Sequence, residues 1–402
     1  MFDIWARLAE LQQPCLYRRI GDRLIGADGL VRREILTSLD RLFCEHLAAG
    51  LASFQAPPAP PPIPAEHRFI NVSALQKAIR RGDADGAVRF AQQGCSLNAE
   101  QVFRRLATIA IEDVGIGNLL AAGMALAVMG NKAMRENGAP DELAAYLAYQ
   151  LAISSKSRLA CDLLSIADYD RTLDPLKRRM AKAEPAGLAS AASDRTAPLA
   201  SRMIAGWLLA GSTRFRGTTI PMIARDRRHF MRLLVIERVP LMFYYTADRA
   251  AARLSDAMFV SMLPIAEMVA PDPSITISRT RLTDAPTIAG YPAAAFDLHT
   301  YEGRLAIGRF GREYMPVAKI VGALSPSMRD TAVRHAVFIA EGGRLAERVE
   351  FEGSKIVERQ AHAAELAFAG IMHEEQKDRL LHEILYGMPT LHQMRAELGK
   401  RL

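Results

Sequence analysis

Hydrophobic residues recur at helical spacing along most of this chain, and the clearest run lies within residues 71–118. Val72, Leu75 and Ile79 fall on one face of a helix, and a Gly-Asp pair at 82–83 breaks the pattern. A second helix is expected to begin at this break. The pattern therefore predicts two helices joined by a tight turn at the start of the run.

A third helix is predicted after a short polar gap. Asn98 stands at the position of an N-cap, and Gln101 follows three residues later as the partner in a capping box. Gly115 and Gly117 end the pattern. Residues 71–118 are thus expected to form three short antiparallel helices. The apolar stripe of the third comprises Val102, Leu106, Ile109 and Ala110.

The residues of this run also match a known family motif. The sequence S-A-L-x-K-A-I-R-x-x-D, followed by R-R-L-x-x-I-A-x-E-D-V-G, resembles the helical region beyond the motor domain in the MgsA/RarA clade of clamp-loader-like AAA+ ATPases. In that family the region is known for oligomerisation, and the whole protein acts at stalled replication forks and single-stranded gaps. The resemblance implies a structural or oligomerisation role, and no catalytic role, for the matching residues. They are Ser73, Ala74, Leu75, Lys77, Arg80, Asp83, Arg104, Arg105, Leu106, Ala110, Glu112, Asp113 and Gly115.

One pair within the motif also has a purely structural interpretation. Arg105 and Glu112 lie seven residues apart and share a helix face. Opposite charges in this arrangement are typical of contacts that hold helices together. We therefore expect an ion pair between Arg105 and Glu112.

The same spacing predicts helices through most of the remaining chain. Alternation at 275–281 indicates an exposed strand, and alternation at 344–352 indicates either a strand or a linker. The predicted fold class is mostly α, with a helical bundle or collar and a second, mainly helical domain that contains little β structure. The further helices are expected at 2–13, 30–52, 119–134, 140–154, 157–168, 202–209, 226–239, 247–263, 301–314, 326–340, 354–371 and 376–385.

Two stretches with the character of linkers divide the chain. Six prolines between residues 55 and 64 forbid a helix and favour an extended spacer. Small and polar residues around 183–198 form a second loose stretch. We expect an N-terminal helical region at 1–54, a proline-rich linker at 55–66, a helical domain like the clamp-loader collar at 67–182, a linker at 183–201, and a mainly helical C-terminal domain of unknown role at 202–402.

The composition is typical of a folded protein, because 50% of the residues are hydrophobic and 24% are charged. A formal net charge of +7 is compatible with a polyanionic partner without requiring one. The four cysteines stand far apart without a C-x-x-C pair, which argues against a disulfide framework and a zinc site. The longest apolar run, at 119–129, is too short to cross a bilayer, and the N-terminus does not read as a signal sequence. A cytoplasmic location is expected.

Motifs for nucleotide hydrolysis and for nucleophilic catalysis are absent from the sequence. No G-x-x-x-x-G-K-[ST] phosphate loop occurs, so the chain resembles the collar without the ATPase motor. The motifs G-x-S-x-G and S-x-x-K are missing too. His362, His373 and His382 do not repeat one helical ligand motif for a metal. We therefore expect no catalytic residue, no metal and no cofactor, although the Asp-Leu-His sequence at 297–299 and these histidines leave open an enzyme site within 202–402 that forms only in the fold.

The strongest basic cluster lies between Gly211 and Pro240, where the sequence has seven arginines and two acidic residues. Three of the arginines recur at i, i+3 and i+7, which predicts a basic stripe along one helix face. Such a stripe suits the phosphates of a nucleic acid strand, and a solvated or protein-facing stripe is the alternative. The candidate nucleic-acid-binding residues are Arg214, Arg216, Arg225, Arg228 and Arg232.

These patterns together predict a non-enzymatic accessory protein of DNA replication or repair. It is expected to oligomerise through its helical collar and to contact single-stranded DNA through the arginine-rich helix. Expected partners are single-stranded DNA, replication or repair proteins and further copies of the chain, with no membrane. The alternatives are an adaptor that binds proteins without nucleic acid, or an enzyme with an unrecognised site in 202–402.

Overall fold

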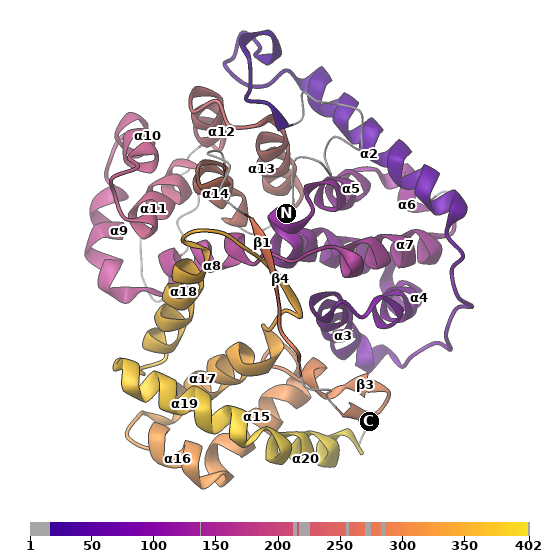
Figure 1. Cartoon of the computed structure of the whole chain (residues 1–402), viewed down its shortest axis with the longest axis vertical. Coiled ribbons are helices and arrows are strands. Elements are labelled where there is room, and N and C mark those ends of the chain that lie inside the picture. The colour runs from indigo at the N-terminus through magenta and orange to yellow at the C-terminus, as the bar shows by residue number, and fades with distance from the viewer. Residues whose placement is uncertain are drawn as a thin grey trace.

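Helices account for most of the computed structural model of the chain (Figure 1), as the hydrophobic pattern predicts. The mostly α fold class is therefore confirmed. None of the described helices is both long enough and apolar enough to cross a membrane. The helix predicted at 2–13 lies outside the described residues. The structure describes residues 17–136, 138–211, 215–216, 226–254, 257–269, 275–282 and 286–400.

The helices of the first part of the chain pack around α5, which is apolar on every face. Residues 119–128 are all buried, so α5 has no side for solvent and lies inside the bundle. Phe43 of α2 lies against Gly123 of α5, where an added Cβ would approach the Phe43 ring to 2.8 Å. A glycine at this position therefore lets the two helices come close together. The bounds are α2 Arg33–Ser53, α3 Arg68–Arg81, α4 Ala84–Ile109, α5 Leu119–Gly130, α6 Lys132–Glu136 and α7 Pro140–Ile153.

The N-cap predicted at Asn98 is present, but the third predicted helix is not separate. Asp83 accepts a hydrogen bond from the Gly86 amide at 2.9 Å and caps α4. Asn98 caps in the same way, accepting from the Gln101 amide at 2.9 Å. The backbone of Asn98 is non-helical, with φ −164° and ψ 93°, so it kinks α4. The predicted second and third helices are thus two parts of one kinked helix.

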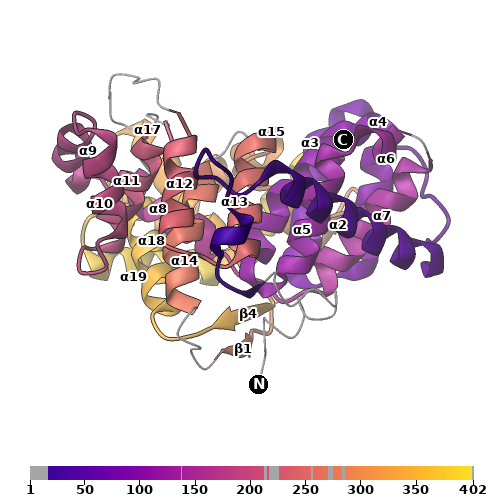
Figure 2. The same ribbon diagram turned by 90° about the horizontal axis from the view of Figure 1, so that it is seen from above.

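Helices α8 to α14 extend the same hydrophobic core, and in Figure 2 most of them lie on the opposite side of the molecule from α2 to α7. Residues 183–201 differ from the loose stretch that was predicted, because buried Leu188 and Ala192 hold α10 against α11. The helix predicted at 247–263 is divided between α13 and α14. The bounds are α8 Leu159–Tyr169, α9 Asp174–Met180, α10 Pro185–Ser193, α11 Leu199–Leu209, α12 Arg228–Ile236, α13 Leu241–Arg253 and α14 Met262–Val269.

The last helices build a second and smaller core, which contains Phe310. Helix α18 belongs to both cores, because Val357 and Ala361 face the first core and Leu366 faces the second. The described hydrophobic cores therefore meet near residue 300 and along α18. The pattern did not predict α16 or α20. The bounds are α15 Tyr301–Glu313, α16 Met315–Val321, α17 Pro326–Val337, α18 Ser354–Phe368, α19 Glu374–Tyr386 and α20 Met388–Gly399.

Two short antiparallel strand pairs complete the described fold. β1 (Thr276–Arg279) pairs with β4 (Glu347–Glu350), and β2 (Thr287–Ile288) pairs with β3 (Tyr291–Pro292). The strand predicted at 275–281 is confirmed, and the undecided stretch at 344–352 is a strand. The Val349 amide of β4 donates to the Lys156 carbonyl at 2.8 Å, so this pair is fastened to the loop before α8.

Gly115 offers a sharp test of how closely the loop before α8 approaches the end of α4. Its φ of +47° and ψ of −128° suit glycine, and an added Cβ would lie 3.0 Å from the Ser157 carbonyl oxygen. Gly115→Ala is expected to lower the free energy of unfolding by about 1–3 kcal/mol.

Gly187 in α10 provides the matched control, since an added Cβ there meets only the Ala183 side chain at 4.0 Å. Gly187→Ala is expected to raise stability by roughly 0.5–1 kcal/mol. Urea denaturation followed by circular dichroism measures both variants. Equal stability of the two variants would contradict the close approach at Gly115.

Candidate functional site

Several charged residues of the motif at 73–115 converge in the interior, where Arg80 is at the centre. Its side chain is 1% exposed, and its Nε donates to Asp113 Oδ1 at 2.8 Å. One terminal nitrogen donates to Glu112 Oε1 at 2.9 Å, and the other donates to the Gly342 carbonyl at 2.6 Å. Arg80 of α3 therefore binds two segments that lie far apart in the sequence.

Both of these segments are π-helical turns. The first, Ala110–Val114, follows α4, and the second, Phe338–Gly342, follows α17. A π-helical turn widens the helix by one residue, and such turns are frequent at functional sites. Here the first turn supplies Glu112 and Asp113, while the second supplies the carbonyl that Arg80 binds.

Three more ion pairs complete this group. Arg158, just before α8, donates to Asp113 Oδ1 at 2.6 Å and lies 3.3 Å from Glu112. Lys77 of α3 pairs with Asp297, and both side chains are 2% exposed. Three cations thus balance three carboxylates, which is what a buried charged group requires. We call this group the charge cluster; it consists of Lys77, Arg80, Glu112, Asp113, Arg158 and Asp297.

The ring of Phe338 lies against the charge cluster. Its centroid is 5.8 Å from Lys77 Nζ, 5.3 Å from the Arg80 guanidinium carbon and 5.5 Å from that of Arg158. The His299 ring meets it edge-on at 5.9 Å. Cations are attracted to the face of an aromatic ring, so Phe338 is held by several partners at once.

The electrostatic environment of the charge cluster favours the ionised form of its carboxylates. Burial opposes ionisation of Glu112, yet Arg80 and Arg158 lower its pKa to about 2. Burial also opposes ionisation of Asp297, and Lys77 holds the pKa of that carboxyl below its usual range. Burial also lowers the pKa of Lys77, although Asp297 opposes this shift, so the cluster is a set of mutually compensating buried ion pairs.

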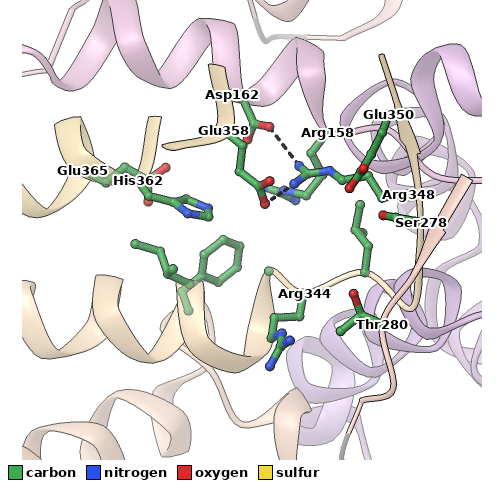
Figure 3. A pocket seen from close by; sticks show the side chains of 14 residues that line it. Arg158, Asp162, Ser278, Thr280, Arg344, Arg348, Glu350, Glu358, His362 and Glu365 are labelled. Atoms are coloured by element: carbon green, nitrogen blue, oxygen red, sulfur yellow. Dashed lines mark hydrogen bonds and ion pairs between the residues drawn. The ribbon is translucent and has the colours of Figure 1, made fainter. Parts of the chain in front are cut away.

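A partly enclosed cavity of about 160 Å³ adjoins this cluster at the meeting of the two cores. Figure 3 shows Arg348 between Asp162 and Glu358, with His362 on one side and the hydroxyls of Ser278 and Thr280 toward the other. We call it the junction cavity. Its lining comprises Arg158, Asp162, Ser278, Thr280, Phe338, Ile339, Gly343, Arg344, Leu345, Arg348, Glu350, Glu358, His362 and Glu365.

A separate surface groove of about 550 Å³ lies along the second part of α4. Residues at helical spacing point into it, and Arg68 at the start of α3 closes its other side. We call it the basic groove. It is lined by Arg68, Asn98, Glu100, Gln101, Arg104, Arg105, Thr108 and Leu254.

The motif residues divide between interior and surface. Leu75 is buried, as its place on the apolar face predicts, and Ser73, Lys77, Arg80 and Asp113 are buried as well, which the sequence pattern alone did not reveal. Glu112 is 17% exposed. Asp83 caps α4, and Arg104 and Arg105 reach the basic groove.

The ion pair predicted between Arg105 and Glu112 is not formed. Glu112 binds Arg80 and Arg158 instead, because the π-helical turn aims it at the interior. Arg105 only contributes to lowering the pKa of Glu112 from a distance. The partners Arg158 and Asp297 were missed, since they lie 45 and 220 residues from their contacts at Asp113 and Lys77.

The described members of the predicted arginine stripe are all engaged within the chain. Arg216 pairs with Asp168 at 3.1 Å, and its guanidinium lies 4.7 Å from the Tyr169 ring centroid. Arg228 pairs with Asp226. Arg232 donates from Nε to the Asp28 carbonyl at 3.0 Å. Arg214 and Arg225 lie outside the described residues.

The C-terminal histidines do not come together. His362 lines the junction cavity, whereas His373 and His382 are exposed on α19 or at its start. In the described chain, no three His, Cys, Asp or Glu side chains are arranged to hold a metal ion.

Substitution of one member of the charge cluster is expected to destabilise the protein strongly. Asp113→Asn leaves Arg80 and Arg158 short of a counter-charge in the interior, which destabilises a protein by about 3–5 kcal/mol. Glu136→Gln is the control, because Glu136 is 61% exposed and pairs with Lys132 only at 3.7 Å. Its effect should stay within about 0.5 kcal/mol in the same denaturation experiment. Similar losses in both variants would mean that the cluster is not a buried unit.

The low pKa of Glu112 predicts acid sensitivity with a defined sign. Because the folded pKa of about 2 lies below the ordinary value of 4.5, the stabilisation is complete above pH 4.5 and is lost as the pH falls toward 2. Glu112→Gln should therefore be less stable than wild type at pH 7 by roughly 3 kcal/mol. The difference should shrink steadily between about pH 4.5 and pH 2 in urea titrations. A constant difference across that range would contradict the assignment.

Comparisons with known proteins add no relative to this description. No family model, no curated protein and no solved structure matches the chain. The resemblance of residues 73–115 to the clamp-loader-like ATPases therefore stays a prediction from the motif.

Proposed function

We propose that this chain is a non-enzymatic nucleic-acid-binding accessory protein that takes single-stranded DNA in the basic groove. The observation that carries the proposal is the groove itself, in which three arginines from two helices converge on one hollow. Positive charge along a groove tracks a phosphate backbone, and this attraction does not depend on base sequence.

The charge of the groove is not cancelled by its own lining. Glu100 is its one acidic residue, and the Glu100 carboxylate pairs with Arg135 at 2.9 Å. Arg104 lies 3.5 Å from Glu100, but the Arg104 side chain is 65% exposed, so this contact is weak. Arg68 and Arg105 form no ion pair with any carboxylate of the described chain. The groove therefore keeps a net positive charge for a polyanion.

An exposed aromatic ring stands beside these arginines. Phe69 is 56% exposed, and the Arg68 guanidinium lies 4.6 Å from its ring centroid. Aromatic side chains next to a basic groove are typical of single-strand binding, because unpaired bases stack on them. Bases in a duplex are already stacked, so Phe69 favours single-stranded over double-stranded partners.

The predicted arginine stripe on α12 is less suited to binding DNA than the basic groove is. Its described arginines, Arg228 and Arg232, each contact an oxygen of the chain that a phosphate would have to displace. Arg68 and Arg105 in the groove form no ion pair in the described chain that a phosphate would have to displace. We therefore place the main DNA contact in the groove and leave α12 as a comparison surface.

The proposed oligomerisation would use surfaces other than the buried motif residues. The buried motif residues hold the inside of one chain together, so they are not available to a second copy. Any assembly of several chains would use exposed residues.

The test is fluorescence anisotropy with a labelled single-stranded oligonucleotide and the matching duplex. Arg68→Ala/Arg104→Ala is expected to weaken single-strand binding about tenfold or more near 0.1 M salt. The slope of log affinity against log salt should fall by about 1.4, because two phosphate contacts are lost at about 0.7 each. Phe69→Ala should weaken the single strand about fivefold or more and leave the duplex nearly unchanged.

The matched control is Arg228→Ala/Arg232→Ala, which removes the same charge from α12. Its affinity should stay within about twofold of wild type apart from the general effect of net charge. If the control loses binding and the groove variant does not, DNA binds the stripe. Absence of binding by the wild type at low salt would reject the proposal and favour the protein adaptor.

A further inference from the structure

We propose that the junction cavity binds a neutral, planar, single-ring heterocycle of the size of a pyrimidine base. The volume of about 160 Å³ sets the size of the ligand. Protein cavities of about 150 Å³ hold one benzene ring, so the junction cavity has room for one six-membered ring and not for two.

The lining selects against charged ligands of either sign. Carboxylates of Asp162, Glu350, Glu358 and Glu365 line the cavity and repel an anion. Arginines line it as well, and they repel a cation. A neutral molecule with polar edges meets neither penalty.

The guanidinium of Arg348 offers hydrogen-bond donors that are already fixed in place. It lies 3.1 Å from Asp162 Oδ2 and also pairs with Glu358, and these contacts hold its orientation. A guanidinium has five N–H donors, and these contacts do not use them all. The remaining donors suit a ring carbonyl, while the neighbouring carboxylate oxygens suit an amino or ring N–H group. A heterocycle with a donor and an acceptor on adjacent ring positions matches this edge.

His362 adds a second polar contact on the other side of the cavity. Its ring makes no hydrogen bond within the described chain, although it lines the cavity. Burial lowers the pKa of His362 despite the nearby Glu358 and Glu365. The ring is therefore neutral at pH 7 and offers one donor and one acceptor to a ligand.

The apolar part of the lining accounts for the planarity of the ligand. Phe338 lines the cavity, and its ring is held by Arg80, Arg158 and the edge-on His299. Because cations already lie over this ring, edge-to-face contact is the arrangement left for a ligand, and it favours another flat ring. Ile339 and Leu345 supply further apolar contact.

The test uses cytosine and uracil as probes, with cyclohexanol as a non-planar ring of similar size. Saturation-transfer NMR should show contact with the cytosine or uracil ring protons, and titration should give a Kd of about 1 mM or tighter. Cyclohexanol should show no transfer. Absence of transfer to both bases would overturn the proposal.

Two variants locate the binding site. Thr280→Trp adds bulk at an exposed position on the cavity rim and should weaken binding about tenfold or more. His362→Phe keeps a ring but removes both hydrogen-bonding nitrogens, and should weaken binding about fivefold or more. Unchanged circular dichroism and melting temperature confirm that both variants fold. Base binding that survives both variants would place the ligand elsewhere and overturn the proposal.

A competition experiment shows whether the ligand is a free base or a base within a nucleic acid strand. Arg68→Ala/Arg104→Ala should leave the affinity for cytosine unchanged, because the cavity does not share residues with the basic groove. If a short single-stranded oligonucleotide displaces cytosine from the groove variant, the cavity takes a base that belongs to a strand. If it does not, the natural ligand is a free base. The cavity experiment can be interpreted even if the basic groove does not bind DNA.

Discussion

The contact between Arg80 and the two π-helical turns is the interaction on which the rest of this structure depends. Arg80 binds Asp113 and Glu112 in the first turn and the Gly342 carbonyl in the second. These turns belong to the larger and the smaller hydrophobic core, so one guanidinium joins both. Buried ion pairs contribute little net stability, because desolvation offsets their attraction. Their effect on geometry is larger, since any other relative position of the cores would leave charges unpaired in a low-dielectric interior. We infer that the charge cluster sets how the two cores meet.

The two binding surfaces that we propose lie on either side of this cluster. Helix α4 carries Arg105 into the basic groove and ends at the turn that supplies Glu112. Glu112 lies 3.3 Å from Arg158, and Arg158 lines the junction cavity. Arg105 forms no ion pair with Glu112, so the charged side chains do not make an unbroken series of contacts from the groove to the cavity. Coupling between the two sites is a free energy that is measured with both sites occupied.

The distribution of arginines shows why local charge density is a poor guide to a binding surface. The stretch between Gly211 and Pro240 is strongly basic in the sequence, yet its described arginines all contact oxygen atoms of the chain, which are the carboxylates of Asp168, Asp226 and Asp22 and the carbonyls of Asp28 and Ala251. The basic groove has fewer arginines, but they come from two helices, and Glu100 is the one carboxylate in its lining. What a polyanion meets is the charge left after internal pairing, and that quantity exists only in three dimensions.

The sequence by itself determined the helical character of this protein, because spacing and caps act over a few residues. The helix pattern, the caps at Asp83 and Asn98 and the strand at 275–281 depend on local chemistry of this kind. Only the tertiary structure decided the sites. Lys77 meets Asp297, and Asp113 meets Arg158, across separations that leave no periodic signal. The motif at 73–115 marked residues that matter, but whether they face a partner or the interior depended on which distant carboxylates and carbonyls the fold brought to them.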